Sequence, residues 1–296
     1  MRPSRGNFSL VILIGVFLLT IFAQIALIHV KYSYENTVNY AQALQLRYLA
    51  NSVSKWLLEQ PILPQNLQFS TTLYPGKNSA NIVGSRSFSS DNCFEYLHVE
   101  AATSVNKHSL AHWSFTPTQD QQSLAAQYMF ISRSVPTGSE FLTNGNLYTS
   151  NGSFILPDIS FLKNKAHTIL SMDWLHAYGF DNNFTYFSNS TSLTYDSTAK
   201  ITKGNALLAS PNSITIKKSF AAPDRLIIIA KGSVTIEDYV TLGNALIMSN
   251  NSVKIGKNCK INGVIFSGGI ISIDGKGTFT HDASAVASFA SVFYIA

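Results

Sequence analysis

Residues 232–275 decide the fold of this chain, and they read GSVTIEDYVTLGNALIMSNNSVKIGKNCKINGVIFSGGIISIDG. In and just before this stretch, pairs of apolar residues two positions apart recur at steps of 18 to 20 residues. Such a pair places two side chains on one face of a strand and the residue between them on the other. The first set of pairs is Ile214/Ile216, Val234/Ile236, Val253/Ile255 and Ile271/Ile273.

Two further sets of apolar pairs follow the same step. Glycines such as Gly232 and Gly256 lie near the expected corners, where the backbone must turn closely. Three short strands in each turn of about 19 residues predict a β-solenoid over residues 201–296, with an evenly spaced β-sandwich as the alternative. The second set is Val240/Leu242 and Cys259/Ile261, and the third is Leu226/Ile228, Ala245/Ile247 and Val264/Phe266.

An apolar stretch near the N-terminus predicts a transmembrane helix. After Arg5 no charged residue occurs before Lys31, and residues 8–30 are nearly all Leu, Ile, Val, Phe and Ala. A helix of this length crosses a hydrocarbon core of roughly 30 Å and exceeds the apolar region of a cleaved signal peptide. The basic residues before it favour a short cytoplasmic leader, residues 1–7, with residues 31–296 outside the cytoplasm.

The helical pattern continues beyond the membrane segment. Residues 32–58 contain no proline or glycine, and Pro61 supplies a stop. Apolar residues such as Val53 and Leu57 recur at the three- and four-residue spacing of a helix. We therefore expect a helical stalk over residues 31–60, packed either on the globular part of its own chain or on copies of itself.

The middle of the chain, residues 61–200, is rich in Ser, Thr, Asn and Tyr. Its short alternating apolar runs are separated by turn sequences such as Asn144-Gly145, which predicts a β-rich connecting domain. Charged residues make up 12% of the whole chain, about half of the usual fraction. The two cysteines exclude a disulfide-rich scaffold and a four-cysteine zinc site.

The start of the apolar helix resembles a known family. The run Arg5-Gly6-Asn7-Phe8-Ser9-Leu10-Val11 is similar to the junction in type IV pilins and pseudopilins, where a basic leader ends in glycine and an apolar helix follows. The resemblance implies that a peptidase cuts between Gly6 and Asn7 and that the helix continues as the spine of the subunit. Val11 stands where the family has a glutamate, a departure seen in its minor, tip-associated members.

The repeat region also resembles a family. Residues 232–275 are similar to bactofilin-type polymer-forming domains and to other β-helical repeats. The resemblance rests on the three registers of apolar pairs. It implies a solenoid whose ends can associate with further copies.

No motif indicates catalysis, a cofactor or a bound metal. His108 and His112 have the spacing of a helical zinc site but lack the glutamate of His-Glu-x-x-His, and no phosphate-binding loop occurs. Glycoside hydrolysis needs two carboxylates that face each other, whereas the carboxylates of the repeats do not recur in one register. We therefore expect surface positions for Asp224, Glu237, Asp238 and Asp274.

The cysteines and the positive charge have simple interpretations. Cys259 takes an inward position, which favours two free thiols over a disulfide with Cys93. The net charge of +5 falls entirely within residues 200–296. Stacked outward lysines suit a polyanion such as DNA or an anionic surface polymer, or else they only keep the domain soluble. The residues concerned are Lys254, Lys257 and Lys260.

Together these features predict a non-enzymatic, single-pass protein of the cell envelope. The leading hypothesis is a minor pilin-like or pseudopilin-like subunit of a type IV filament or secretion-type assembly, with the membrane and other pilin-like chains as partners. One alternative is an anchored cell-surface scaffold or adhesin that self-associates through its solenoid. The other is a carbohydrate-active β-helix enzyme.

Overall fold

The protein divides into two compact units. The first comprises Met1–Gly84, Val99–Leu110 and Ile295–Ala296, and the second comprises Ser85–His98 and Ala111–Tyr294. The computed structural model describes residues 5–59, 66–75, 78–134, 137, 147–149, 156–163, 165, 167–169, 184–188, 192–195, 204–218 and 224–295.

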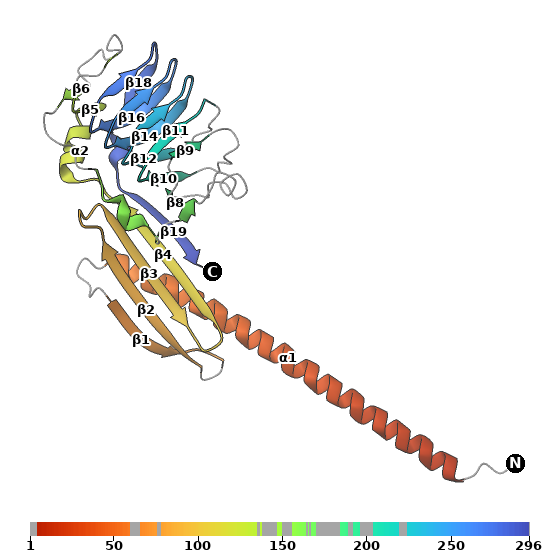
Figure 1. Cartoon of the computed structure of the whole chain (residues 1–296). Helices are drawn as coiled ribbons and strands as arrows, with labels where there is room; N and C mark the ends of the chain where they lie inside the picture. The colour runs from red at the N-terminus through yellow and green to blue at the C-terminus, as the bar shows by residue number, and fades with distance from the viewer. Residues whose placement is uncertain are drawn as a thin grey trace. The chain divides into compact units, whose positions relative to one another are not determined.

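Helix α1 (Arg5–Glu59) is one continuous helix, as the sequence predicts (Figure 1). The apolar side chains of its first half, from Ile12 to Val30, are exposed, except for the partly buried Ile21. Within the described residues, Ile12–Glu59 is the one helix that is long and apolar enough to cross a membrane. Such a helix is consistent with a single membrane span or with a signal sequence.

The second half of α1 packs on its own chain within the first unit. The Gln42 side chain donates a hydrogen bond of 2.9 Å to the Pro75 carbonyl and accepts one of 2.9 Å from Asn78 Nδ2. A Cβ atom at Gly84 would lie 2.8 Å from Leu57 Cδ1, so this glycine lets the helix approach closely. The buried residues follow the three- to four-residue spacing of one helix face and are Gln42, Leu46, Ala50, Val53, Ser54 and Leu57.

An antiparallel sheet follows the helix, in the part of the chain predicted to be β-rich. Its order is β1-β2-β3-β4-β19, so the last strand of the chain joins four strands from its first half. The five strands are β1 (Asn66–Thr72), β2 (Ser79–Phe88), β3 (Phe94–Ala102), β4 (Lys107–Phe115) and β19 (Phe289–Ile295).

Within the part of the chain that the structure describes, short helices interrupt the β structure at three places. Helix α2 (Gln119–Ala125) begins with a capping box, in which Thr118 and Gln121 bond each other's backbone N–H groups. The 3₁₀ helices η2 (Ile159–Leu162) and η3 (Ala283–Val286) begin after Asp158 and Asp282, which accept hydrogen bonds from backbone N–H groups. The sequence pattern predicts only β structure at these places, so these helices were not expected.

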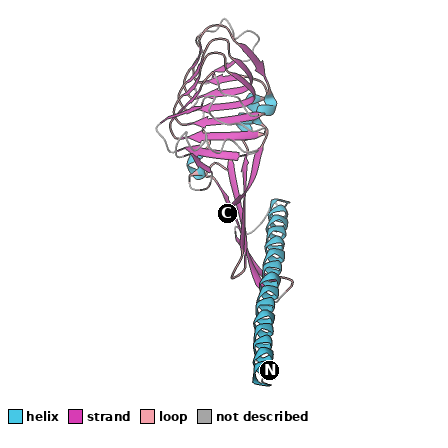
Figure 2. Ribbon diagram, turned by 90° about the vertical axis from the view of Figure 1, so that its right-hand side faces the viewer, coloured by secondary structure: helices cyan, strands magenta, loops and turns pink. Residues whose placement is uncertain are grey.

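The C-terminal part is a β-solenoid with turns of about 19 residues, which confirms the prediction (Figure 2). One parallel sheet has the order β17-β15-β13-β11-β9, and the other has the order β6-β5-β16-β14-β12-β10-β8-β7 with β18 also paired to β16. The first sheet contains β9 (Ser192–Tyr195), β11 (Ser213–Ile216), β13 (Val234–Ile236), β15 (Val253–Ile255) and β17 (Ile271–Ile273). The second contains β5 (Phe130–Ser132), β6 (Leu147–Thr149), β7 (His167–Ile169), β8 (Phe184–Ser188), β10 (Asn205–Ser210), β12 (Arg225–Ala230), β14 (Thr241–Ser249), β16 (Lys260–Ser267) and β18 (Thr278–His281).

The first predicted register is confirmed. Val234 pairs with Ile214 on one side and with Val253 on the other, and Val253 pairs with Ile271. All eight residues of this set are buried in one core cluster. The strands that pair in these sheets begin before residue 201, since β9 stacks on β11 and β8 stacks on β10.

The third predicted register is wrong at its last pair. The sequence pattern aligns Val264/Phe266 with Ala245/Ile247, but Ile247 pairs with Ile265. Ala245, Ile247 and Ile265 belong to the core inside the solenoid, whereas Val264 and Phe266 belong to a second cluster. Between β14 and β16 the positions that face the core are therefore 18 residues apart.

A β-bulge causes this shift. Two residues of β14 separate Leu242 from Ala245, whereas one residue of β16 separates their partners Ile261 and Gly263. Gly263 has φ +149°, and a Cβ atom there would collide with the Ala245 carbonyl oxygen. In β14 and β16 the predicted second and third sides of the turn are consequently one long strand, interrupted by the bulge.

The middle strands of the longer sheet are buried on both faces. Ile228 and Ile247 face the core inside the solenoid, while Ile227 and Leu246 face the second cluster, which also contains Trp113. Continuous apolar runs such as those of β12 and β14 are typical of parallel strands with both faces covered.

The last turn of the solenoid is covered by a segment from the middle of the chain. Strand β5 pairs with β16, joining Phe130 to Ile265. The Thr137 backbone N–H donates a hydrogen bond of 3.1 Å to the Ile271 carbonyl. The Ile273 N–H donates a second bond of 3.1 Å to the Thr137 carbonyl. Residue 137 therefore occupies the free edge of β17.

Candidate functional site

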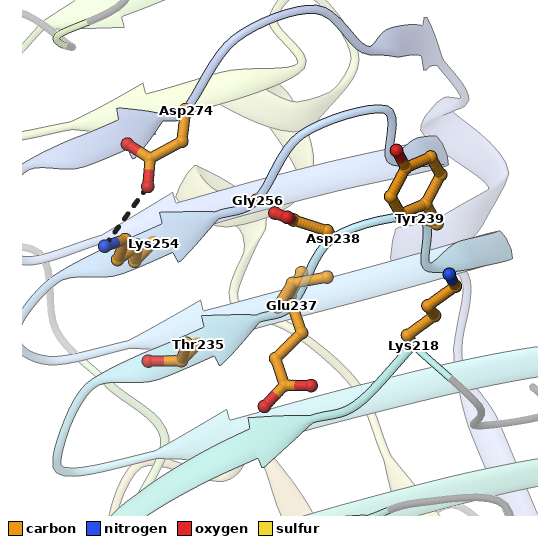
Figure 3. Close-up of a pocket in the computed structure, with 9 residues that line it drawn as sticks. Lys218, Thr235, Glu237, Asp238, Tyr239, Lys254, Gly256 and Asp274 are labelled. Carbon is orange, nitrogen blue, oxygen red and sulfur yellow. Dashed lines mark ion pairs between the residues drawn. The ribbon is translucent and has the colours of Figure 1, made fainter.

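A hollow of about 480 Å³ lies on the outer face of the shorter solenoid sheet (Figure 3). We call it the corner hollow, because it extends from β13 and β15 to the turn that follows β13. It is lined by Lys218, Thr235, Ile236, Glu237, Asp238, Tyr239, Lys254, Gly256 and Asp274.

The stacking of strands positions these side chains. Thr235 and Lys254 are the middle residues of β13 and β15 and pair in register, so both point away from the core. Asp274 follows β17 in the next turn, and its carboxylate lies 3.1 Å from the Lys254 ammonium (Figure 3). Both side chains are about half exposed, at 58% and 47%.

The turn after β13 is held by the turn above it. Asp238 Oδ1 accepts a hydrogen bond of 2.7 Å from the Lys257 N–H. A Cβ atom at Gly256 would lie 2.6 Å from the Asp238 N, so only glycine fits this corner. The Asp238 carboxylate is therefore fixed in place before any ligand arrives.

Tyr239 adopts a left-handed backbone conformation, with φ 64°. Asn258 occupies the same corner one turn later and has φ 56°. Asparagine enters this region readily, whereas a bulky residue does so at a cost of about 1–3 kcal/mol, and such residues cluster at functional sites. Tyr239 is 55% exposed, and the Lys218 ammonium lies 4.4 Å from the centre of its ring.

The charge of the corner hollow is mixed. Its two lysines and three carboxylates leave a formal charge of −1. Within the described residues, no group of three or more His, Cys, Asp or Glu side chains is arranged to hold a metal ion. The arrangement offers hydrogen-bond donors, acceptors and an aromatic face in one shallow site.

The three lysines singled out from the sequence are all exposed, on three successive segments. Lys254 lies in β15 and in the corner hollow, Lys257 lies in the turn, and Lys260 begins β16. Two carboxylates accompany them, since Asp274 pairs with Lys254 and Asp238 bonds the backbone of Lys257. Tyr239 was not predicted as a site residue, and its only signal in the sequence is that it stands one repeat before Asn258.

The predicted processing residues, Gly6 and Asn7, lie in the first turns of α1. The two histidines, His108 and His112, lie in strand β4, where four residues span about 13 Å, and so they do not form the helical pair of a zinc site. Burial lowers the pKa of His112, an effect partly opposed by the charge of Glu95.

Both cysteines are buried free thiols, as predicted. Burial, reinforced by the nearby carboxylate of Asp91, raises the pKa of the Cys93 thiol to about 12. Burial also raises the pKa of Cys259. A thiol with a raised pKa is a poor nucleophile, so neither cysteine has the properties of a reactive site.

Comparison of the chain with protein-family models, with curated proteins and with solved structures found no match.

Proposed function

We propose that this protein is a minor pilin-like or pseudopilin-like subunit of a type IV filament or secretion-type assembly, anchored through α1. The observation that carries the proposal is the division of one helix into two halves. The half up to Val30 exposes its apolar side chains, and the half after Gln42 packs on an antiparallel sheet of the same chain.

The exposed half needs an apolar environment. Phe17, Leu19 and Phe22 are each at least 65% exposed, and no charged residue lies between Arg5 and Lys31. A bilayer supplies that environment, and so do the equivalent helices of neighbouring subunits. In this proposal the solenoid stays outside the cytoplasm and the protein performs no catalysis.

The resemblance at Arg5-Gly6 sharpens the proposed role. Val11 gives the helix no carboxylate to neutralise the terminal amine of a neighbouring subunit, which suits a position at the tip or at initiation. An anchored scaffold that polymerises through its solenoid ends is less well supported. Thr137 bonds the edge of β17, so among the described residues this edge is already occupied by the chain itself.

Processing of the N-terminus tests the proposal. In cells that contain a prepilin peptidase, we expect the mature chain to begin at Asn7 and the Gly6→Leu variant to keep its leader. The matched control is Gly15→Leu, a glycine of the same helix with nothing within 4 Å of its missing Cβ.

N-terminal sequencing distinguishes the other outcomes. An intact Met1 or Arg2 in the presence of the peptidase would contradict the pilin-like assignment and leave a plain anchor. An N-terminus near residue 44 would identify a secreted protein with a cleaved signal sequence.

A further inference from the structure

We propose that the corner hollow binds an uncharged saccharide. This inference goes beyond the proposed role of α1 and does not depend on it, because it concerns residues 218–274 of the solenoid alone. The site combines a half-exposed tyrosine with hydrogen-bonding groups on four successive turns.

The size of the corner hollow suits a small ligand. Its volume of about 480 Å³ lies within the range of small-molecule sites, about 300–1,000 Å³. Thr235 and Lys254 stand side by side on neighbouring strands, and Asp274 lies one turn further on. These rigid strands keep the polar groups at fixed spacing, so little ordering is needed when a ligand binds.

The chemistry of the lining groups matches sugar hydroxyls, which both donate and accept hydrogen bonds. The Lys254 ammonium donates, the carboxylates of Glu237 and Asp238 accept, and the Thr235 hydroxyl does both. No ion pair is found for Glu237 in the described part of the chain, and its carboxylate lines the hollow, which leaves it available. A carboxylate that can still accept hydrogen bonds is a stronger partner for a hydroxyl than a neutral acceptor is.

Tyr239 supplies the apolar contact that a sugar ring needs. The ring combines an apolar face with a polar tip, as is typical of exposed aromatic binding residues. The left-handed backbone at this corner places a tyrosine where the next turn has Asn258. An aromatic ring thus occupies a backbone conformation that disfavours it, as is expected of a residue that contributes to function.

The charges argue for an uncharged ligand. Three carboxylates against two lysines disfavour a polyanion, and the Lys254 ammonium is already paired with Asp274. A neutral saccharide meets no net repulsion, and its binding should depend little on salt.

The test uses the full-length protein held in a detergent without a sugar head group. Cellohexaose, chitohexaose and maltohexaose are titrated by calorimetry, and we expect at least one to bind. We expect Tyr239→Asn to weaken that binding by at least about tenfold through loss of the aromatic contact. Its melting temperature should be unchanged, because asparagine accepts this backbone conformation.

Three matched measurements make the result decisive. Tyr239→Phe should keep the affinity within about threefold, because the ring remains, and Glu237→Gln should weaken it. Lys257→Gln, outside the hollow, should leave it unchanged. Failure of all three saccharides to bind, or binding that is unaffected by Tyr239→Asn, would overturn the proposal. Displacement of the bound saccharide by heparin would assign the hollow to polyanions and overturn it too.

Discussion

The guanidinium of Arg225 donates a hydrogen bond of 2.8 Å to the main-chain carbonyl of Ala285, which lies 60 residues further along the chain. The same guanidinium donates a hydrogen bond of 3.1 Å to the Ser288 carbonyl and another to the Ala287 carbonyl. Arg225 is only 8% exposed. One buried cation thus attaches the segment before β19 to the start of β12.

We expect Arg225→Met to lower the free energy of unfolding by about 3 kcal/mol, because three carbonyls lose a charged donor. The exposed Lys276→Met is the control and should change stability by less than about 0.5 kcal/mol. Denaturant titration measures both. A loss for Arg225→Met no larger than that of the control would contradict this role.

The strand register of the solenoid predicts a large loss of stability for a change at one residue and a small loss for a change at its neighbour. Ile255→Asp would bury a carboxylate without a partner, at a cost of about 3 kcal/mol or more. Lys254→Gln removes only a half-exposed ion pair and should cost less than about 1 kcal/mol. Equal melting temperatures for the two variants would rule out the register.

The bulge predicts a difference between two glycines. Gly263→Ala should destabilise the protein by about 2 kcal/mol, because its Cβ meets the Ala245 carbonyl oxygen. Gly243→Ala, on the partner strand, has nothing within 4 Å of its Cβ and should be nearly neutral. Similar melting temperatures for the two variants would contradict the bulge as described.

Burial of His112 predicts loss of stability in mild acid. Its pKa in the folded protein lies below the ordinary value of 6.5, so the unfolded chain takes up a proton that the folded chain excludes. Neutral His112 therefore makes its full contribution to stability above about pH 6.5, and this contribution declines as the pH falls toward the lowered pKa of the folded protein. We expect the melting temperature of His112→Leu to fall less than that of the parent between about pH 7.5 and pH 5.5. Parallel curves would show that His112 does not contribute.

The lysines of the solenoid predict a result with polyanions. Because Asp274 and Asp238 accompany Lys254 and Lys257, we expect these lysines to act as solubilising charge. Replacing Lys254, Lys257 and Lys260 with Gln should therefore change heparin or DNA binding less than about twofold at low salt. A tenfold loss that disappears at high salt would instead establish a polyanion site.

The sequence predicted those parts of the fold that repeat or are local. The first register could be found because inward pairs such as Val234/Ile236 return after nearly constant steps. The long helix could be found because no glycine or proline follows Gly15 before Pro61. The bulge could not be found, because one extra residue in β14 leaves a pattern that fits a step of 19 as well as 18.

The corner hollow was less predictable than the fold. Lys254 was singled out for its charge, but its pairing with Asp274 requires knowing that β15 lies beside β17. Tyr239 carried no signal as a single residue, since its significance comes from comparison with Asn258 at the same corner. Sites assembled from successive turns become visible only when the turns are superimposed.

The pairing of β5 with β16 sets the order in which a newly synthesised chain can complete its fold. Ile131 leaves the ribosome long before its partner Phe266 has been made. The turns from β10 to β14 can add one after another as they emerge, but the edge of β5 that faces β16 stays unpaired until β16 has been made. A chain interrupted before residue 260 would keep that strand open, and an open strand edge is a site for aggregation. Translation through to the final turns thus protects a strand made at the beginning of the second unit.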